Sequence, residues 1–339
     1  FSSAGVARSS ARPTKRRGPL NALDKLASRM TFGVELPLDN DWSAGGRQKA
    51  AADGRPFGVP DVSRMTGRVL LAESLGFEAA WVRDVPVHDP NFGDAGSVFD
   101  PFPLLGFLAG KTSRMILGTA AIVVPLRDPI HLAKMAASVH ELSNHRFVMG
   151  VASGDRPVEY PLMNVDFESR GDRLRESLST IRHLWRGGGL QGAKGKVTVR
   201  PFVGDGPPIV MAGMGQQSLN WLADNVDGWF TYPGPPEQAQ RRLDLWRTTR
   251  SQAGREEAPV LTAMHLDLQD NPDAPKEQMR LGARLGRNAL IEEIMGLQAV
   301  GVTHLSFAFR ESNRPVDEVM EELAREVFPH VSKSEELTI

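Results

Sequence analysis

The amino-acid sequence predicts an α/β fold, a single (β/α)8 TIM barrel, on three observations. Short apolar runs alternate with amphipathic stretches from residue 31 to about residue 330. There are eight such runs, each followed by a helical pattern, in a stretch long enough for this fold. No linker rich in Pro, Gly or Ser divides the chain, which favours one closed barrel over the alternative, a doubly wound open sheet.

The predicted strands are apolar runs bounded by turn residues. They lie at residues 31–36, 77–82, 115–124, 146–152, 207–212, 228–232, 260–268 and 303–309. The stretches between them place apolar residues three and four positions apart, as amphipathic helices do. Clear examples are residues 61–76, 128–143, 169–185 and 315–328.

Two of the connections that follow strands are long. They span residues 37–59 after the first strand and residues 83–100 after the second. In a barrel the functional site lies at the C-terminal ends of the strands. We therefore expect these two loops to form much of the pocket wall.

The composition is that of an ordinary globular protein, and it excludes several classes of function. With a formal net charge of −1 over 339 residues, nothing favours nucleic acid or an anionic membrane as a partner. The absence of cysteine excludes disulfides, thiolate metal sites and a cysteine nucleophile, and it fits a cytoplasmic, reducing location. No apolar run approaches the roughly 20 residues that a membrane-spanning helix needs.

The first twenty residues differ from the rest because they carry five basic side chains and no acid. Such a leader resembles an organelle transit segment, and a trimmed or engineered arm has the same composition. We therefore divide the chain into a basic, partly disordered arm (1–30), a barrel domain (31–330) and a C-terminal tail (331–339).

The loop after the second strand carries the acid–base candidates. Arg83, Asp84 and His88 lie where barrel enzymes place groups that contact the substrate. A His or Asp in a loop with Pro and Gly can instead cap a turn. Four aromatic side chains could line a pocket for a ring or belong to the core, namely Trp42, Trp81, Phe92 and Tyr232.

A glycine-rich loop follows the fifth strand and opens a helix. Free backbone N–H groups at such a point favour an anion, so the loop is a candidate phosphate cradle. Its residues are Gly213, Met214, Gly215, Gln216, Gln217 and Ser218. The alternative is a glycine-rich turn without a ligand. The loop is a poor dinucleotide fingerprint because it lacks the acidic residue, about twenty positions on, that would hold a ribose.

Other chemistries have little support in the sequence. His131, His140 and His145 lie nine and five residues apart, without the cysteine or fixed carboxylate pattern that would complete a zinc site. There is no G-x-S-x-G elbow and no Walker loop. The glycine-rich stretch at residues 187–196 follows a helix instead of a strand, which indicates a flexible hairpin tip.

Several stretches occur in the order seen in one protein family. FGVELPL resembles its first strand, AESLGFEAAWVRD its first helix and second strand, and LGTAAIVVPLRDPIHLAK its third strand and following helix. LSNHRFVMGVASGDRP resembles the fourth strand, and PPIVMAGMGQQS the fifth strand with its phosphate loop. From residue 31 to about residue 330 the chain therefore resembles the bacterial luciferase-like flavin-dependent monooxygenases.

The resemblance implies an FMN site. In this family the third strand carries a bulge and a non-prolyl cis peptide that backs the flavin ring, and the matching pair here is Ala120–Ala121. An arginine at the place of Arg170 commonly reaches the flavin phosphate. The alternative for Arg170 is a salt bridge at the helix start with Glu168 or Asp172. Together with the glycine-rich loop, the implied cofactor residues are Thr119, Ala120, Ala121, Ser153, Gly154, Arg156 and Arg170.

The sequence departs from true luciferases at two positions. They have an arginine where Ser153 stands, and Arg156 is the nearby residue that could replace it. Their active-site histidine corresponds to a position near Val85, whereas His88 comes three residues later. Aldehyde oxidation with light emission is therefore not expected.

The implied function is that of a flavin-dependent oxidoreductase, with a two-component monooxygenase favoured. Such an enzyme uses O2 and reduced FMN, supplied by a separate NAD(P)H:flavin reductase, on a small organic substrate. The alternatives are an F420-dependent dehydrogenase on the same barrel, a flavin- or ligand-binding protein without turnover, and a phosphate-binding barrel enzyme of the isomerase type. The family also implies a homodimer or higher oligomer, and the apolar stretch at residues 99–110 is a candidate interface.

Overall fold

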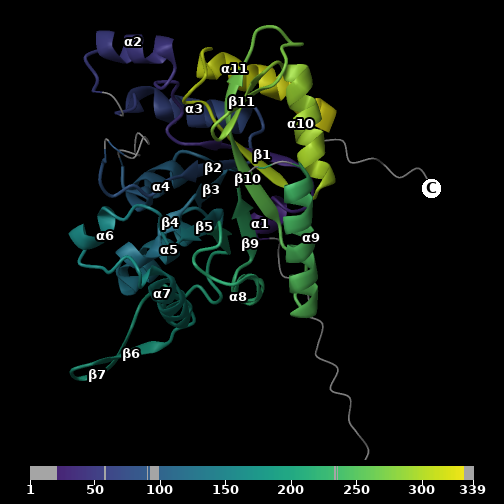
Figure 1. Cartoon of the computed structure of the whole chain (residues 1–339). Helices are drawn as coiled ribbons and strands as arrows, with labels where there is room; N and C mark the ends of the chain where they lie inside the picture. The colour runs from purple at the N-terminus through teal and green to yellow at the C-terminus, as the bar shows by residue number, and fades with distance from the viewer. Residues whose placement is uncertain are drawn as a thin grey trace, which may run out of the picture.

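A computed structural model describes residues 21–56, 59–89, 91, 99–232, 234 and 236–331. Eight parallel strands form a closed barrel, because β10 pairs with both β13 and β9 (Figure 1). In their order around the barrel the strands are β1 (Thr31–Glu35), β2 (Ala79–Val82), β3 (Ile116–Thr119), β5 (Phe147–Ala152), β8 (Ile209–Ala212), β9 (Gly228–Thr231), β10 (Val260–Leu268) and β13 (His304–Ala308). The predicted fold and all eight predicted strands are confirmed.

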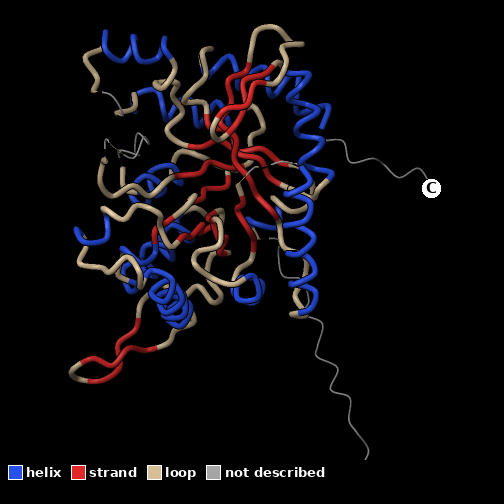
Figure 2. Tube along the Cα trace, in the orientation of Figure 1, coloured by secondary structure: helices blue, strands red, loops and turns tan. Residues whose placement is uncertain are grey.

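Helices cover the outside of the strands (Figure 2). The longer ones are α3 (Val62–Ser74), α4 (Pro101–Ala109), α5 (Pro129–Leu142), α7 (Arg170–Trp185), α9 (Pro236–Gln252) and α10 (Arg287–Ala299). Shorter helical segments are α1 (Ala22–Lys25), α2 (Ala44–Ala52), α6 (Glu159–Leu162), α8 (Leu219–Asn225), α11 (Val316–Glu322) with its π-helical extension Leu323–Val327, α12 (Phe328–Val331) and the 3-10 turn Val124–Leu126. None of the helices in the described part of the chain combines the length and apolar character that crossing a membrane requires.

Local sequence explains where two of these helices begin. An Asp-Pro pair stands at the start of α4 and again at the start of α5, with the proline as first helical residue. The Asp100 and Asp128 side chains accept hydrogen bonds from backbone N–H groups of the first turn, at 3.0 Å from Phe102 N and 2.9 Å from Ile130 N. Asp at the cap and Pro at the first position are both favoured helix starts.

The residues just before β1 close the bottom of the barrel, at the N-terminal ends of the strands. Leu23 and Leu26 are at most 3% exposed and pack with barrel-interior residues such as Ile116 and Leu261. Residues 21–30 belong to the predicted arm (1–30), but the structure shows them folded, with α1 and Leu26 packed at the barrel end. The predicted arm up to residue 20 and the tail from residue 332 lie outside the described residues.

Close packing inside the barrel requires glycine at two strand positions, Gly118 on β3 and Gly150 on β5. A Cβ added to Gly118 would lie 2.3 Å from the Trp81 ring, and one added to Gly150 would lie 1.8 Å from the carbonyl oxygen of Thr119. Trp81 is fully buried inside the barrel. It therefore belongs to the core, and the interpretation of Trp81 as a pocket-lining aromatic is wrong.

Two antiparallel hairpins extend the fold. The predicted hairpin at residues 187–196 is confirmed as β6 (Gly189–Gly192) paired with β7 (Gly195–Thr198). The second hairpin, β11 (Glu277–Met279) and β12 (Gly282–Leu285), was not predicted. Its β12 pairs in parallel with β10, which places the turn at Arg280 and Leu281 beside the C-terminal end of the barrel.

Candidate functional site

A cavity of about 430 Å³ lies at the C-terminal ends of the barrel strands. One part of its wall is built of small and apolar residues, namely Ala120, Ala212, Phe230 and Ala263. Another part carries charged and titratable side chains, namely Glu35, Arg83, Asp155, His265, Arg280 and Glu311. Trp42 and Tyr232 also line the cavity, as the sequence analysis expected of pocket aromatics.

A larger groove of about 1280 Å³ lies elsewhere, among residues such as Pro208 and Asp227 that precede strands. These residues belong to the N-terminal ends of the strands, where barrel proteins place stability and not catalysis. Size alone would favour this groove, but its position favours the smaller cavity as the functional site.

The bond between Ala120 and Ala121 is a non-prolyl cis peptide, as the resemblance implied. It follows β3 and precedes β4 (Ile122–Val123), so the strand is interrupted there. Thr119 is fully buried and its Oγ1 donates to the Gly150 carbonyl at 2.7 Å, whereas Ala120 lines the cavity. Of the predicted trio, Ala120 lines the cavity, Thr119 is buried and Ala121 is partly exposed.

The glycine-rich loop after β8 forms a nest of backbone N–H groups. Gly213, Gly215 and Gln216 have positive φ angles of 63°, 56° and 59°. Within the described part of the chain, the N–H groups of Met214, Gly215 and Gln216 have no acceptor. The side-chain amide of Gln217 holds the loop in this conformation, because its Nε2 donates to the Gly215 carbonyl at 2.9 Å. Unused N–H groups in such a turn fit an anion.

Arg170 begins α7 next to this nest. A Cβ added to the following residue, Gly171, would lie 2.9 Å from the Cβ of Gln216, so the helix start and the loop are in contact. The Arg170 guanidinium lies 3.7 Å from the centre of the Phe167 ring, and its Nη1 donates to the Phe167 carbonyl at 2.8 Å. Its Nη1 also lies 3.9 Å from Glu168 Oε2, so the alternative salt bridge is present, at a Glu168 side chain that is 84% exposed. The Arg170 Nε is buried and has no hydrogen-bond partner. A buried, unpaired guanidinium nitrogen fits an anionic ligand.

Contacts with Tyr160 and Glu159 fix the loop after β5. Ser153 offers its carbonyl to the Tyr160 hydroxyl, and Gly154 has a φ of 83° with Tyr160 Oη 2.4 Å from where a Cβ would be. Arg156 is buried, with its Nη1 3.6 Å from Glu159 Oε1. Burial raises the pKa of Glu159 to about 7 despite this arginine. These contacts favour a structural role for Arg156, and its role at the phosphate stays a prediction.

The three acid–base candidates do not come together. Arg83 lines the cavity. Asp84 is directed away, since its carboxylate accepts from Arg127 at 2.6 Å and from Val123 N at 3.0 Å and its side chain is 1% exposed. His88 is exposed and does not line the cavity. Phe92 lies outside the described residues.

The cavity contains titratable residues that the sequence analysis missed. His265 Nδ1 lies 3.7 Å from Glu311 Oε2, and the Trp42 ring stands 6.1 Å from the imidazole at an angle of 55°. The neighbouring His265 imidazole lowers the pKa of Glu311. The alternation along β10 could have revealed His265, because Leu261, Ala263 and His265 share the face directed into the barrel.

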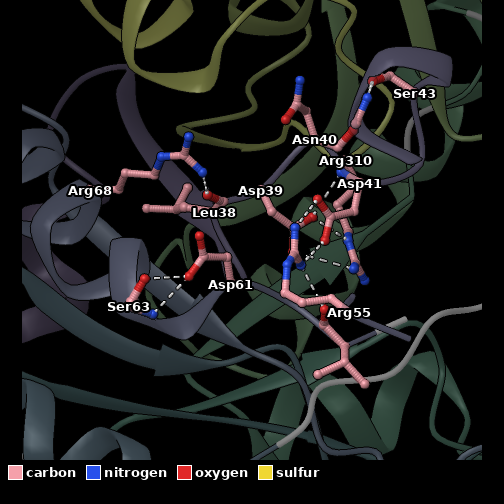
Figure 3. A network of polar contacts seen from close by, with 12 residues as sticks. Leu38, Asp39, Asn40, Asp41, Ser43, Arg55, Asp61, Ser63, Arg68 and Arg310 are labelled. Atoms are coloured by element: carbon pink, nitrogen blue, oxygen red, sulfur yellow. Dashed lines mark hydrogen bonds and ion pairs between the residues drawn. The ribbon is translucent and has the colours of Figure 1, made fainter. Parts of the chain in front are cut away.

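The loop after β1 contains Trp42, which lines the cavity. Its Asp39 and Asp41 form charge pairs with Arg310 and Arg55 (Figure 3). Arg310, beyond β13, lies 4.7 Å from the Trp42 ring centre, and its Nε donates to Asp39 at 3.1 Å. Burial raises the pKa of Asp39, which Arg310 opposes. Asp41 accepts from Arg55 at 2.6 Å in the same network. The aromatic wall of the cavity is thus fixed by buried charge pairs.

The closed barrel, with a cavity and a nest of backbone N–H groups at the C-terminal ends of its strands, defines the class of (β/α)8-barrel proteins. Within that class, residues 30–328 match the family described as luciferase-like monooxygenase, and the chain belongs to this family of oxidoreductases. The recognition made from the sequence is confirmed.

Individual relatives include proteins with and without a known activity. An uncharacterised Mycobacterium tuberculosis protein is 30% identical over 236 residues, 62% of this chain and 82% of that protein. The oxygenase component of a flavin-dependent trigonelline monooxygenase from Acinetobacter baylyi is 38% identical over 119 residues, 34% of this chain and 32% of the relative.

Solved structures share the fold at low sequence identity. A monooxygenase from Streptomyces bottropensis has a TM-score of 0.69 at 19% identity, over 89% of this chain and 99% of its own. A coenzyme F420-dependent tetrahydromethanopterin reductase from Methanopyrus kandleri has a TM-score of 0.67 at 17% identity, over 90% of this chain and 100% of its own. At this identity the likeness concerns the barrel and not the cofactor.

Proposed function

We propose that this protein is the oxygenase of a two-component system, which uses reduced FMN and O2 on a small organic substrate. The observation that carries the proposal is the pairing of two features at one end of the barrel. One is the part of the cavity wall that consists of the small apolar residues Ala120, Ala212 and Ala263. The other is the nest of unused N–H groups, which contacts the start of α7, where Arg170 has a buried Nε without a hydrogen-bond partner. A flat ring with a phosphate tail requires both features.

Reduced FMN, when bound, would supply the two electrons with which one oxygen atom of O2 is reduced to water while the other enters the substrate. The residues of the chain would bind and orient it. The loop from Gly213 to Ser218 and Arg170 would hold the phosphate, and Ala120 would contact the ring. Trp42 and Tyr232 would limit the access of water to the reacting atoms.

The proposed source of electrons is a separate NAD(P)H:flavin reductase. The part of the chain that the structure describes is one barrel with two hairpins, and it contains no second βαβ unit for a nicotinamide dinucleotide. The relative from Acinetobacter baylyi is likewise named as an oxygenase component. A cytoplasmic location, where reduced nicotinamides occur, belongs to the same proposal.

A homodimer or higher oligomer is also part of the proposal. Phe107 on α4 is 48% exposed, and Ile130 on the neighbouring α5 and Leu70 on α3 are each 40% exposed. A second copy of the chain would cover these side chains. Light scattering should give a mass of at least twice the 37.1 kDa of one chain, and a value near 37.1 kDa at micromolar concentration would contradict this.

The test compares cofactors and electron donors. The purified protein should bind FMN, measured by absorbance and fluorescence titration, more tightly than F420. NADH alone should bleach bound FMN slowly, and adding a flavin reductase should make the bleaching fast. Rapid bleaching by NADH or NADPH without a reductase would contradict the two-component assignment. Preferential binding of F420 would favour the dehydrogenase, and binding of FMN without any oxygen consumption would favour a non-catalytic flavin protein.

A further inference from the structure

His265 and Glu311 come from two neighbouring strands at the C-terminal end of the barrel. His265 lies on β10 opposite Ala308 of β13, and Glu311 follows β13 by three residues. Both side chains line the cavity, and His265 Nδ1 is 3.7 Å from Glu311 Oε2. The His265 side chain is 12% exposed and that of Glu311 is 35% exposed, so the pair is partly sheltered from solvent and still open to a ligand.

The backbone of His265 is fixed on both sides. On one side β10 pairs with β13. On the other, His265 N donates to the Leu281 carbonyl at 3.0 Å, and a Cβ on Gly282 would lie 1.8 Å from the His265 carbonyl oxygen. The unpredicted β11–β12 hairpin therefore clamps this strand position. A catalytic group needs such support, because small displacements of it are costly.

We propose that His265 is the acid–base residue of this site and that Glu311 is its positioning residue. The proposal deepens the proposed function and rests on it. Since Glu311 lies at Nδ1, it favours the tautomer with the proton on Nδ1, which leaves Nε2 to exchange a proton in the cavity. The substrate class is a small organic molecule that gains or exposes a hydroxyl group as it is oxidised.

The proton balance of the reaction is complete without another reagent. Reduced FMN, O2 and the substrate give FMN, water and a product with one added oxygen atom. The two hydrogens that leave reduced FMN end in the water molecule. His265 Nε2 takes up a proton and releases it within the same cycle, so the residue returns to its starting state.

Several charged groups face the imidazole and would shape its pH dependence. Glu35 from β1, Arg83 at the end of β2 and Arg310 beyond β13 line a narrow recess with His265. Arg280 from the hairpin turn and Asp155 from the loop after β5 line the main cavity. Since both positive and negative groups surround His265 and Glu311, replacing Glu311 should change the pH dependence of the rate without abolishing it.

The experiment uses the full chain loaded with FMN, with His265→Gln and Glu311→Gln as variants. His131→Gln is the matched control, because that side chain is 81% exposed on the outer helix α5. All variants should bind FMN within threefold of the original protein. Stopped-flow mixing of the reduced, FMN-loaded protein with O2 then gives the rate of hydrogen peroxide release at each pH. No organic substrate is needed for this measurement.

The original protein and the control should show one titration step in this rate. His265→Gln should lose the step and be slower by about 100-fold, the lower end of what an acid–base residue contributes. Glu311→Gln should keep the step and move its midpoint to lower pH, because an amide stabilises an imidazolium less than a carboxylate does. In His265→Ala, added imidazole should restore part of the rate, which a merely structural role would not allow.

Unchanged rate and pH profile in His265→Gln, with FMN still bound, would overturn the proposal and leave the proposed function standing. A second measurement needs no cofactor. In the unloaded protein, carbon NMR of the Glu311 carboxyl should show its pKa rising towards the ordinary value of 4.5 when His265 becomes Gln. An unchanged carboxyl titration would mean that the pair does not form. Failure of the original protein to bind FMN would count against the proposed function alone, and the carboxyl titration of the unloaded protein would still test whether His265 and Glu311 form a pair.

Discussion

Two histidines inside the same barrel have opposite surroundings. At the bottom, His304 of β13 is fully buried, Trp81 Nε1 donates to its Nε2 at 2.9 Å, and its Nδ1 lies 2.9 Å from Thr31 Oγ1. At the top, His265 of β10 lines a cavity with one carboxylate 3.7 Å away. The imidazole at the bottom has its partners inside the protein, and the imidazole at the top is open to a ligand.

The difference shows how one barrel separates stability from function. The bottom cluster of Thr31, Trp81 and His304 leaves no hydrogen-bonding capacity for a ligand, because Thr31 Oγ1 also donates to the Thr303 carbonyl at 3.0 Å. At the top, Arg280 has no hydrogen bond or ion pair within the described part of the chain. Changes at the bottom should therefore affect the free energy of unfolding, and changes at the top should affect ligand binding.

The largest effect on stability is expected for Trp81→Ala. Removing a fully buried indole leaves a cavity and an unpaired His304 nitrogen, so the free energy of unfolding should fall by about 3–5 kcal/mol. Urea unfolding measures this value. Trp42→Ala, at the top, should cost clearly less and should weaken FMN binding instead. Equal losses of stability in the two variants would show that the top of the barrel contributes as much to stability as the bottom.

A pH effect of intermediate size is expected at His304. Burial lowers the pKa of His304 to about 3, whereas the same side chain in the unfolded chain titrates near 6.5. Between these values the unfolded chain binds more protons, so the free energy of unfolding should fall as the pH drops below 6.5. The slope from this residue is about 1.4 kcal/mol per pH unit at most. His304→Gln should lack this slope in urea unfolding from pH 7 to pH 5, and an unchanged slope would argue that His304 is charged in the fold.

The smallest effect on stability is expected for Arg280→Ala and Glu35→Gln. Neither side chain has a hydrogen bond or ion pair among the described residues, so each change should alter the free energy of unfolding by less than about 0.5 kcal/mol. A loss above about 1 kcal/mol in urea unfolding would mean that the top of the barrel is also built for stability.

The sequence was sufficient to predict the strands and the glycine-rich turn after β8, because these features are local. The run VLTAMHLDL carries the burial pattern of β10 within itself, and Gly213 and Gly215 mark a turn by their own backbone preferences. Features that depend on distant partners were missed or misjudged. Asp84 looked catalytic because its partner Arg127 lies 43 residues away, and His265 was overlooked because Glu311 lies 46 residues further along the chain.

The hairpin of β11 and β12 was missed for a different physical reason. Its turn, Arg280–Leu281, contains none of the glycine or asparagine pairs that favour a tight hairpin. The pairing of β12 with β10 supplies the order instead, with Arg284 Nε donating to the buried Asp267 at 2.7 Å. Tertiary contacts of this kind have no signature in a single sequence.

The most direct test of the account asks whether the nest and Arg170 hold a phosphate. FMN and riboflavin differ only in that group, so both are titrated into the original protein, into Arg170→Ala and into the control Arg186→Ala, whose side chain is paired with Asp205 on the surface. Arg170→Ala should weaken FMN binding by about 1.5–3 kcal/mol, leave riboflavin binding almost unchanged, and so reduce the preference for FMN. Equal losses for the two ligands, or no preference for FMN in the original protein, would contradict a flavin phosphate site at this end of the barrel.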